Sequence, residues 1–211
     1  MFGTSSHEDL IHYLQSSGAL SSPLVIEAFQ NVDRADFVPE GFAPEVYEDY
    51  PLHIGEGQTI SQPSVVAMMM EMLDVHKAQK ILDIGSGSGW TTALLAFMVG
   101  ENGSVTGLER VRSLVEFGRE NLKKYNFAHA RILQAGDALG LPGESFERIL
   151  VSAAAEKFPH ALAKQLKIGG KLVIPVGNSI YEVTKNENGA LEGVEHYGFT
   201  FVPLITRYEE T

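Results

Sequence analysis

The sequence predicts an α/β fold built on a doubly wound, mostly parallel sheet with an antiparallel edge near the C-terminus. An apolar run at 81–84 leads into a glycine turn and then a helical pattern, as at the ligand crevice of such folds. Apolar runs and helical patterns then alternate over 104–151. Finally, Asn188-Gly189 separates two extended runs, which is a hairpin signal.

The glycine turn carries Gly85, Gly87 and Gly89 at alternate positions. Glycine accepts positive φ angles and lets a ligand contact the main chain. Dinucleotide-binding turns use G-x-G-x-x-G instead, with the pyrophosphate at the helix N-terminus. The spacing G-x-G-x-G therefore favours a ligand that places no phosphate on the turn. Asp83 agrees, because a carboxylate repels pyrophosphate and attracts an ammonium or sulfonium group.

A second carboxylate, Glu109, ends the next apolar run at 104–109, about twenty residues beyond the glycines. Folds of this kind place there the acid that binds a ribose diol. Its two oxygens can accept from both hydroxyl groups. We therefore expect a ligand that contains ribose; the alternative is a solvated residue that only ends a strand.

Residues 1–50 predict a small helical cap. One of the serines at 5–6 is expected to cap a first helix, which ends at Gly18. One of the serines at 21–22, followed by Pro23, begins a second helix.

The segment 51–64 is dense in Gly, Pro and small polar residues, which predicts a loop. An apolar helix follows at 65–73, so we expect this loop to lie over the crevice. It contains three neutral hydrogen-bonding residues, Gln58, Thr59 and Ser61. Two roles stay open for this segment, which are capping the following helix, through Ser61 or Ser64, and contacting a ligand.

Asp137 follows a predicted strand at 130–134 and is expected on the crevice side of the sheet. Its carboxylate can accept from an exocyclic amino group such as that of adenine; the alternative is an Asx turn. After a fourth strand at 148–151, small residues in 152–159 leave room for a substrate. The glycine pair at 169–170 predicts a helix end before another strand.

Bulk composition restricts the class of protein. The chain has 211 residues, a formal charge of -11 and a pI of about 5.0. The length predicts a single domain. Because nucleic-acid binding favours a basic face and this chain is acidic, we expect no nucleic-acid partner. There is no cysteine, and no metal site is expected. No signal peptide is apparent and no apolar run approaches the ~20 residues of a membrane span, so a cytoplasmic protein is expected.

Several sequence runs together carry a family resemblance: "DRADFVP" (33–39), "YEDYPLHIGEGQTISQP" (47–63), "ILDIGSGSGWTTALLA" (81–96), "LERV" (108–111), "GDALGLP" (136–142), "ILVSAAA" (149–155), "LKIGGKLVIPVG" (166–177) and "FVPL" (201–204). They resemble the class I S-adenosylmethionine-dependent methyltransferases and, within these, the protein-L-isoaspartate (D-aspartate) O-methyltransferases. The sequence departs from the family pattern at His53, Trp90, Ala138 and Glu147, and none of these changes removes a polar contact.

The resemblance implies a seven-stranded, Rossmann-like methyltransferase fold, with 1–50 as the cap, 51–64 as the active-site loop and 65–211 as the cofactor-binding core. It implies S-adenosylmethionine as cofactor and S-adenosylhomocysteine as its product. The implied cofactor contacts are Thr59, Gly85, Ser86, Gly87, Gly89, Glu109, Asp137 and Ala138. The implied substrate contacts are Ile60, Ser61, Val202 and Pro203, and Ser61 is the implied catalytic residue.

The reaction implied is methylation of the free carboxylate of L-isoaspartyl or D-aspartyl residues in damaged proteins and peptides. The ester then closes to a succinimide, which can reopen as normal aspartate. A carboxylate with a pKa of about 4 is already ionised at neutral pH, so no general base is needed. Positioning and desolvation would supply the catalysis, with one hydrogen bond from Ser61 to aim the carboxylate. A monomer is expected.

Three other functions share part of this sequence pattern. A nicotinamide oxidoreductase shares the strand, glycine turn and acid, but its glycine spacing differs. A non-catalytic nucleotide-binding module would keep the fold without turnover. A related carboxylate O-methyltransferase, acting on a specialised peptide or a small acid, is the nearest competitor. Methyl incorporation into paired normal and isoaspartyl peptides distinguishes these possibilities.

Overall fold

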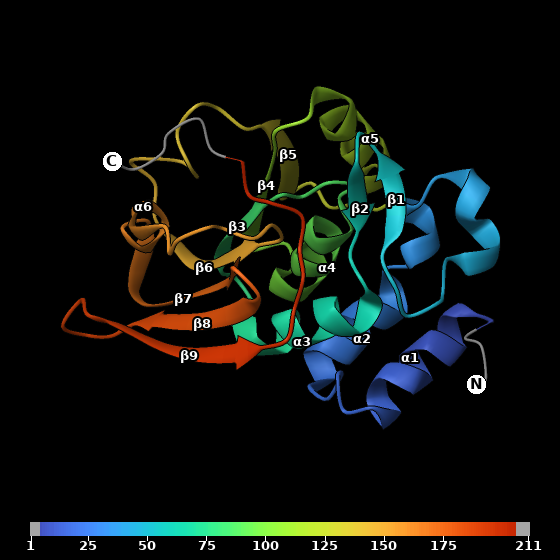
Figure 1. Ribbon diagram of the computed structural model, residues 1–211, viewed down its shortest axis with the longest axis horizontal. Helices are drawn as coiled ribbons and strands as arrows, with labels where there is room; N and C mark the ends of the chain where they lie inside the picture. Colours follow the sequence, from blue (N-terminus) through green and yellow to red (C-terminus); the bar gives the residue numbers. More distant parts are fainter. Residues whose placement is uncertain (1–4, 206–211) are drawn as a thin grey trace.

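The computed structural model describes residues 5–205 and has a seven-stranded sheet at its centre (Figure 1). In spatial order the strands are β5 (Ala130–Gln134), β4 (Ser104–Glu109), β3 (Lys80–Ile84), β6 (Phe146–Val151), β7 (Leu166–Val176), β8 (Ser179–Lys185) and β9 (Leu191–Tyr197). The first five strands in this order, from β5 to β7, are parallel to one another. Strand β8 pairs antiparallel with β7, and β9 pairs antiparallel with β8. The predicted fold, with its C-terminal antiparallel edge, is confirmed.

Apolar side chains along the strands alternate between two core clusters, one on each face of the sheet. The helices that pack on the sheet are α3 (Pro63–Leu73), α4 (Trp90–Val99), α5 (Arg112–Leu122) and α6 (His160–Ala163). Ile81 and Val105 belong to the cluster that contains α3, α4 and α5. Leu82 and Leu172 belong to the other cluster, which contains Leu162 of α6. Within residues 5–205, no helix combines the length and apolar character that crossing a membrane requires.

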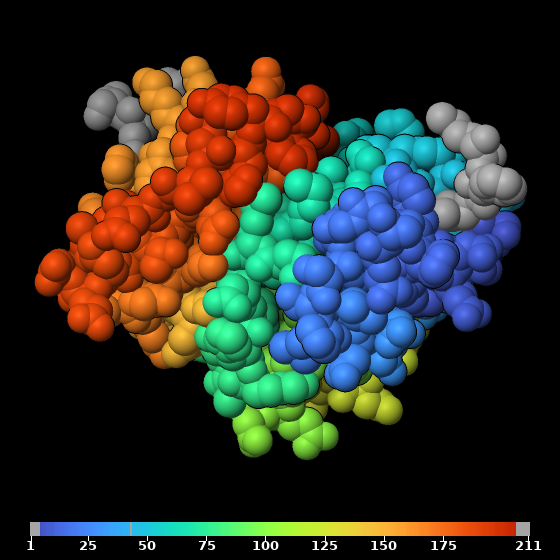
Figure 2. All heavy atoms as spheres, turned by 90° about the horizontal axis from the view of Figure 1, so that it is seen from below, coloured from blue at the N-terminus to red at the C-terminus, as the bar shows by residue number. Residues whose placement is uncertain are grey.

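The N-terminal cap comprises α1 (His7–Ser16), α2 (Pro23–Asn31) and the 3-10 turns η1 (Arg34–Phe37) and η2 (Glu40–Glu45). Ser6 caps α1, because its hydroxyl oxygen accepts from the Asp9 N–H at 3.1 Å. Ser22 is the N-cap residue of α2, but its hydroxyl donates to Glu71 of α3 instead. Figure 2 shows the cap in blue beside the green surface of the region that includes α3.

The segment 51–64 is not a loop throughout, which corrects one expectation. Strands β1 (Leu52–Gly55) and β2 (Gln58–Ile60) pair antiparallel and form a separate two-stranded sheet. The residues between them turn with positive φ angles, 54° at Glu56 and 69° at Gly57. The glycine density that predicted a loop therefore belongs to the tight turn of a hairpin.

The glycine pair at 169–170 does not end a helix, which corrects a second expectation. Helix α6 ends at Ala163, and β7 runs through both glycines. Between Phe146 and Arg148 of β6, the partner residue in β7 advances from Leu166 to Lys171. The glycines lie in this irregularity, where a Cβ at 170 would come within 2.8 Å of the Lys167 carbonyl oxygen. Glycine is therefore needed at these two positions because of the irregular pairing of β7 with β6, and not because a helix ends there.

Candidate active site

A cavity of about 540 Å³ opens at the carboxyl ends of β3, β4, β5 and β6. Its wall combines the turn after β3, the end of β4, the loops after β5 and β6, the β1–β2 hairpin and the segment 202–205. Open α/β sheets bind their ligands at this edge. The volume falls within the range of about 300–1,000 Å³ that is usual for small-molecule sites.

The structure brings almost all of the predicted site residues together. The cavity is lined by Thr59, Ile60, Ser61, Gly85, Ser86, Gly87, Glu109, Asp137, Ala138, Val202 and Pro203. Gly89 is the exception, because it is not part of the cavity wall. It has a φ of 89°, and a Cβ there would lie 3.0 Å from the Gly118 carbonyl oxygen of α5. Its glycine is therefore required for backbone conformation and for helix packing.

The glycine turn is fixed by main-chain hydrogen bonds. The N–H groups of Gly85 and Ser86 both donate to the Leu108 carbonyl, at 2.8 and 3.1 Å. Gly85 and Gly87 have φ angles of 77° and 50°, which favour glycine. Within the described part of the chain, the buried hydroxyl of Ser86 has no hydrogen-bond partner. It is therefore available to a ligand in the cavity.

Glu109 joins the end of β4 to the glycine turn. Its side chain is largely buried, and its Oε2 accepts from the Gly87 N–H at 3.0 Å. Its Oε1 accepts from the Val111 N–H at 2.8 Å. A carboxylate offers about four lone-pair sites, so both oxygens can still accept from ligand hydroxyls. Glu109 can thus hold the turn and bind a diol at the same time.

Asp83 does not contact the cavity, although the sequence placed its charge beside the ligand. It is fully buried, and its Oδ2 accepts from the hydroxyls of Thr91 and Thr92 at 2.8 and 2.6 Å. Burial raises the pKa of Asp83 to about 6, against the lowering effect of the two hydroxyls, and the Glu109 charge raises it further. Asp83 connects β3 to the first turn of α4.

The buried carboxyl of Asp83 is expected to make stability depend on pH. Its pKa is 3.8 in ordinary surroundings and about 6 in the fold. Between these values the folded chain holds a proton that the unfolded chain has lost. The free energy of unfolding that this extra proton contributes is therefore fully present below about pH 4 and is lost as the pH rises through about 6.

Urea unfolding of the natural chain and of Asp83→Asn, measured from pH 4 to pH 8, checks this expectation. Asparagine does not titrate, so the difference in unfolding free energy should move in favour of Asp83→Asn as the pH rises. The other titrating groups are shared by both chains and cancel in this difference. Two parallel pH profiles would show that Asp83 does not titrate in this range.

Ser61 lies at the end of the hairpin, and it is not the cap of the following helix. The N-cap residue of α3 is Gln62, with no side-chain cap. The Ser64 N–H donates instead to Asp49 Oδ1 at 2.8 Å. Ser61 is half-buried in the cavity wall, so the structure excludes the capping role and leaves ligand contact open.

Ile54 and Gln134 are two examples of cavity-wall residues that were not assigned to the site from the sequence. Ile54 alternates with exposed His53 along β1, and that alternation was the available signal. Gln134 is the last residue of β5, so its place at a strand end could have indicated it. Among the residues described, no group of three or more His, Cys, Asp or Glu side chains is placed to hold a metal ion.

Comparison with known proteins identifies the family. Residues 5–209 match the family model described as protein-L-isoaspartate(D-aspartate) O-methyltransferase. The chain belongs to this family. The resemblance inferred from the sequence is confirmed, and it extends over nearly the whole chain.

Two relatives and one solved structure agree with this family. The chain is 42% identical over 206 residues to protein-L-isoaspartate O-methyltransferase of Methanopyrus kandleri, covering 95% of this chain and 91% of the relative. It is 41% identical over 191 residues to the protein of that name from Methanothrix thermoacetophila, covering 89% and 90%. A crystal structure of such an enzyme from Plasmodium falciparum, in complex with S-adenosyl-L-homocysteine, has a TM-score of 0.84 and 28% identity, covering 95% of this chain and 99% of that one.

Proposed function

We propose that this chain transfers a methyl group from S-adenosylmethionine to the free carboxylate of L-isoaspartyl or D-aspartyl residues in damaged proteins and peptides. The observation that carries this proposal is the family match over residues 5–209. The methyl ester then closes to a succinimide, which can reopen as normal aspartate. The alternatives, a methyltransferase for another carboxylate and a non-catalytic binding module, are not favoured by these relatives.

The cavity fits S-adenosylmethionine, whose bound form would supply a sulfonium methyl group to an ionised carboxylate. Glu109 offers free acceptor sites for a ribose diol, and the Ser86 hydroxyl is an available donor. Gly85 and Gly87 let a ligand approach the main chain closely. We propose that Thr59, Gly85, Ser86, Gly87 and Glu109 hold this cofactor, with Asp137 and Ala138 beside its adenine.

The residues of this chain would then position and desolvate the substrate carboxylate. A substrate carboxylate is already ionised at neutral pH, so its attack would need no general base from the cavity wall. The N–H of Ala154 donates to the Val202 carbonyl at 2.8 Å, which fixes the segment before Pro203. Ile60, Val202 and Pro203 would exclude water from the substrate, and the Ser61 hydroxyl would donate to its carboxylate.

Ser61→Ala is expected to lower turnover of an isoaspartyl peptide by roughly 10-fold or more, because the carboxylate loses the donor that aims it. Affinity for S-adenosylhomocysteine should stay close to that of the natural chain. A labelled methyl-transfer assay with paired normal and isoaspartyl peptides measures turnover, and calorimetry measures affinity.

The matched control for that experiment is Ser64→Ala, because only the main-chain N–H of Ser64 makes the contact to Asp49. Its turnover should be unchanged. Normal turnover in Ser61→Ala would remove Ser61 from the mechanism. If the natural chain incorporated no methyl group into the isoaspartyl peptide, the proposed function itself would be wrong.

We also propose that the chain works as one domain, as a monomer, in the cytoplasm. The single domain is supported by a core cluster that joins the cap to the sheet, with Leu14 of α1 and Phe29 of α2 in the same cluster as Leu94 of α4. Within it, 1–50 would form the cap, 51–64 the active-site hairpin and 65–211 the cofactor-binding core.

A further inference from the structure

Arg34, the first residue of η1, is a cation with no solvent exposure. Its described hydrogen bonds all go to main-chain carbonyls. Nη1 donates to the carbonyls of Val46 and Glu48 at 2.7 and 3.1 Å. Nη2 donates to those of Tyr50 and Ser61 at 2.9 and 3.3 Å. Burial lowers the pKa of Arg34 to about 10, which leaves the guanidinium charged at neutral pH.

These carbonyls lie at the two ends of the β1–β2 hairpin. Residues 46–50 lead into the hairpin, and Ser61 is the first residue after it. The guanidinium therefore joins the two ends at the base of the hairpin. It also lies 5.7 Å from the ring centroid of Trp90, the first residue of α4. A planar group with several fixed donors can make all of these contacts at once, which an ammonium group cannot.

Asp49 holds the same part of the chain through residues that follow Ser61. Its Oδ1 accepts from the Ser64 N–H at 2.8 Å, and its Oδ2 accepts from Gln62 Nε2 at 3.1 Å. The negative charge of Asp49 also favours the charged form of Arg34. Ser61 is thus held through its own carbonyl by Arg34 and through the next residues by Asp49.

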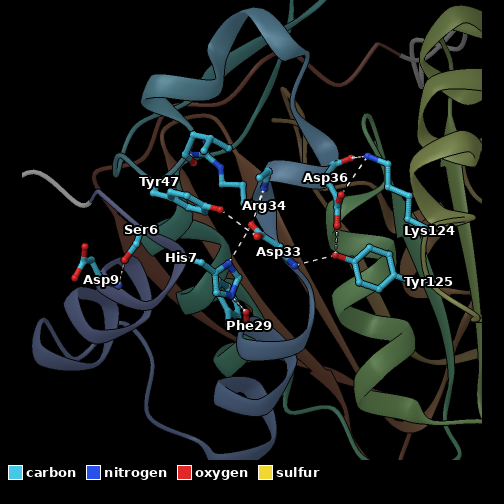
Figure 3. A network of polar contacts seen from close by, with 12 residues as sticks. Ser6, His7, Asp9, Phe29, Asp33, Arg34, Asp36, Tyr47, Lys124 and Tyr125 are labelled. Atoms are coloured by element: carbon cyan, nitrogen blue, oxygen red, sulfur yellow. Dashed lines mark hydrogen bonds and ion pairs between the residues drawn. The ribbon is translucent and has the colours of Figure 1, made fainter.

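The backbone that carries Arg34 is itself anchored to α1 and to the residues that follow α5 (Figure 3). Asp33 accepts from Tyr47 Oη at 3.0 Å and forms an ion pair of 3.0 Å with Nδ1 of His7 in α1. Asp36 accepts from the hydroxyl of Tyr125, just after α5, at 2.7 Å. That same Tyr125 oxygen accepts from the Asp33 N–H at 2.9 Å. Because η1 is fixed on both sides, the guanidinium has a defined position.

We propose that Arg34 is a positioning residue for methyl transfer, because it holds the Ser61 main chain and so sets the direction of the Ser61 hydroxyl. The proposal rests on the proposed role of Ser61. The glycine turn is bound to Leu108 and Glu109 rather than to Arg34, so the contacts that the turn and Glu109 would make with the cofactor should not depend on the guanidinium. Loss of the guanidinium should therefore lower kcat and spare cofactor binding.

Arg34→Lys tests this, because lysine keeps the charge and loses the planar set of donors. We expect kcat with an isoaspartyl peptide to fall about 10-fold, and the Kd for S-adenosylhomocysteine to stay within about twofold. The matched control is Arg148→Lys. Arg148 is also buried and donates to main-chain carbonyls, those of Asp74 and Glu147, but it is not part of the cavity wall. Its kcat should be unchanged.

The decisive measurement adds Arg34→Lys to Ser61→Ala. If Arg34 acts through Ser61, the double variant should have the kcat of Ser61→Ala alone. Independent losses that multiply would overturn the proposal, as would a normal kcat in Arg34→Lys. An inactive natural chain would instead contradict the proposed function, so the two failures are distinguishable.

If Arg34→Lys does not fold, Asp33→Asn takes its place. This change weakens the contact of η1 with His7 and leaves the guanidinium intact. We expect kcat to fall about threefold, with unchanged affinity for S-adenosylhomocysteine and no further loss in the Ser61→Ala background. A normal kcat, or losses that multiply in the double variant, would overturn the proposal.

Discussion

Glu109→Ala is expected to weaken the binding of S-adenosylhomocysteine by about 1–3 kcal/mol, or roughly 5- to 150-fold in Kd. Two effects act together. The ribose hydroxyls would lose their acceptor, and the Gly87 N–H would lose the oxygen that it contacts at 3.0 Å. Because that N–H is part of the glycine turn, the turn would also be less well fixed. Calorimetric titration with S-adenosylhomocysteine measures the loss directly.

Two further variants separate these effects from a change in net charge. Glu109→Gln keeps one carbonyl acceptor and should lose less affinity than Glu109→Ala. Glu116→Ala removes the same charge from an exposed position on α5, where its only described ion pair is with Arg112, and should bind normally. An affinity for Glu109→Ala equal to that of the natural chain would place the ribose elsewhere.

The central part of the site was predictable because its signals are local. The order of strand, glycine turn and helix is contiguous in the sequence, and Glu109 ends the next strand. Parallel strands bring their carboxyl ends to one edge, so Asp137 could be placed there too. The positions of the glycine turn, Glu109 and Asp137 all follow from the order of strands and helices, and all three line the same cavity in the structure.

Residue type and position next to the glycine turn did not predict what Asp83 and Gly89 contact. Asp83 precedes the turn, as the sequence indicated, but its carboxylate is oriented toward the hydroxyls of Thr91 and Thr92. Gly89 belongs to the glycine pattern, but it packs against Gly118 of α5. The orientation of each depends on a helix that packs there only after folding, and a local pattern does not contain that information.

The corrected segments share a different cause. The strands of the hairpin, Leu52–Gly55 and Gln58–Ile60, are so short that the glycines, prolines and small polar residues around them dominate the composition of the segment. The glycines at 169–170 are explained only by how β7 pairs with β6. Arg34 is a similar case, because its partners are carbonyl oxygens, which every residue possesses. Such contacts leave no signature of residue types in a single sequence.

Gly118 lies in the middle of α5 and gives the last prediction, because two effects act on it in opposite directions. Alanine is favoured over glycine within a helix by about 1 kcal/mol, so propensity alone predicts that Gly118→Ala stabilises the fold. However, its Cβ would lie 2.9 Å from the Gly87 carbonyl oxygen and 2.9 Å from Ile132 Cδ1. The Ile132 methyl group can move, whereas the Gly87 oxygen belongs to the fixed turn.

Helix α5 cannot easily move away, because Asn121 Nδ2 donates to the Ser88 carbonyl at 3.0 Å and holds the helix against the turn. We therefore expect Gly118→Ala to lower the unfolding free energy by about 1–3 kcal/mol, since overpacking outweighs propensity. Because displacement of Gly87 also disturbs its contact with Glu109, the affinity for S-adenosylhomocysteine should fall as well. Urea unfolding and calorimetry measure the two losses separately.

Gly41→Ala is the control, because a Cβ at Gly41 in η2 would have no neighbour within 4 Å, and its stability should change by less than about 0.5 kcal/mol. If Gly118→Ala were as stable as the natural chain and bound S-adenosylhomocysteine normally, the gain in helix propensity would have offset the cost of overpacking. The close approach of α5 to the glycine turn would then be adjustable. In that case the shape of the turn would depend on Glu109 and Leu108 alone, and the loss in Glu109→Ala should lie at the upper end of its expected range.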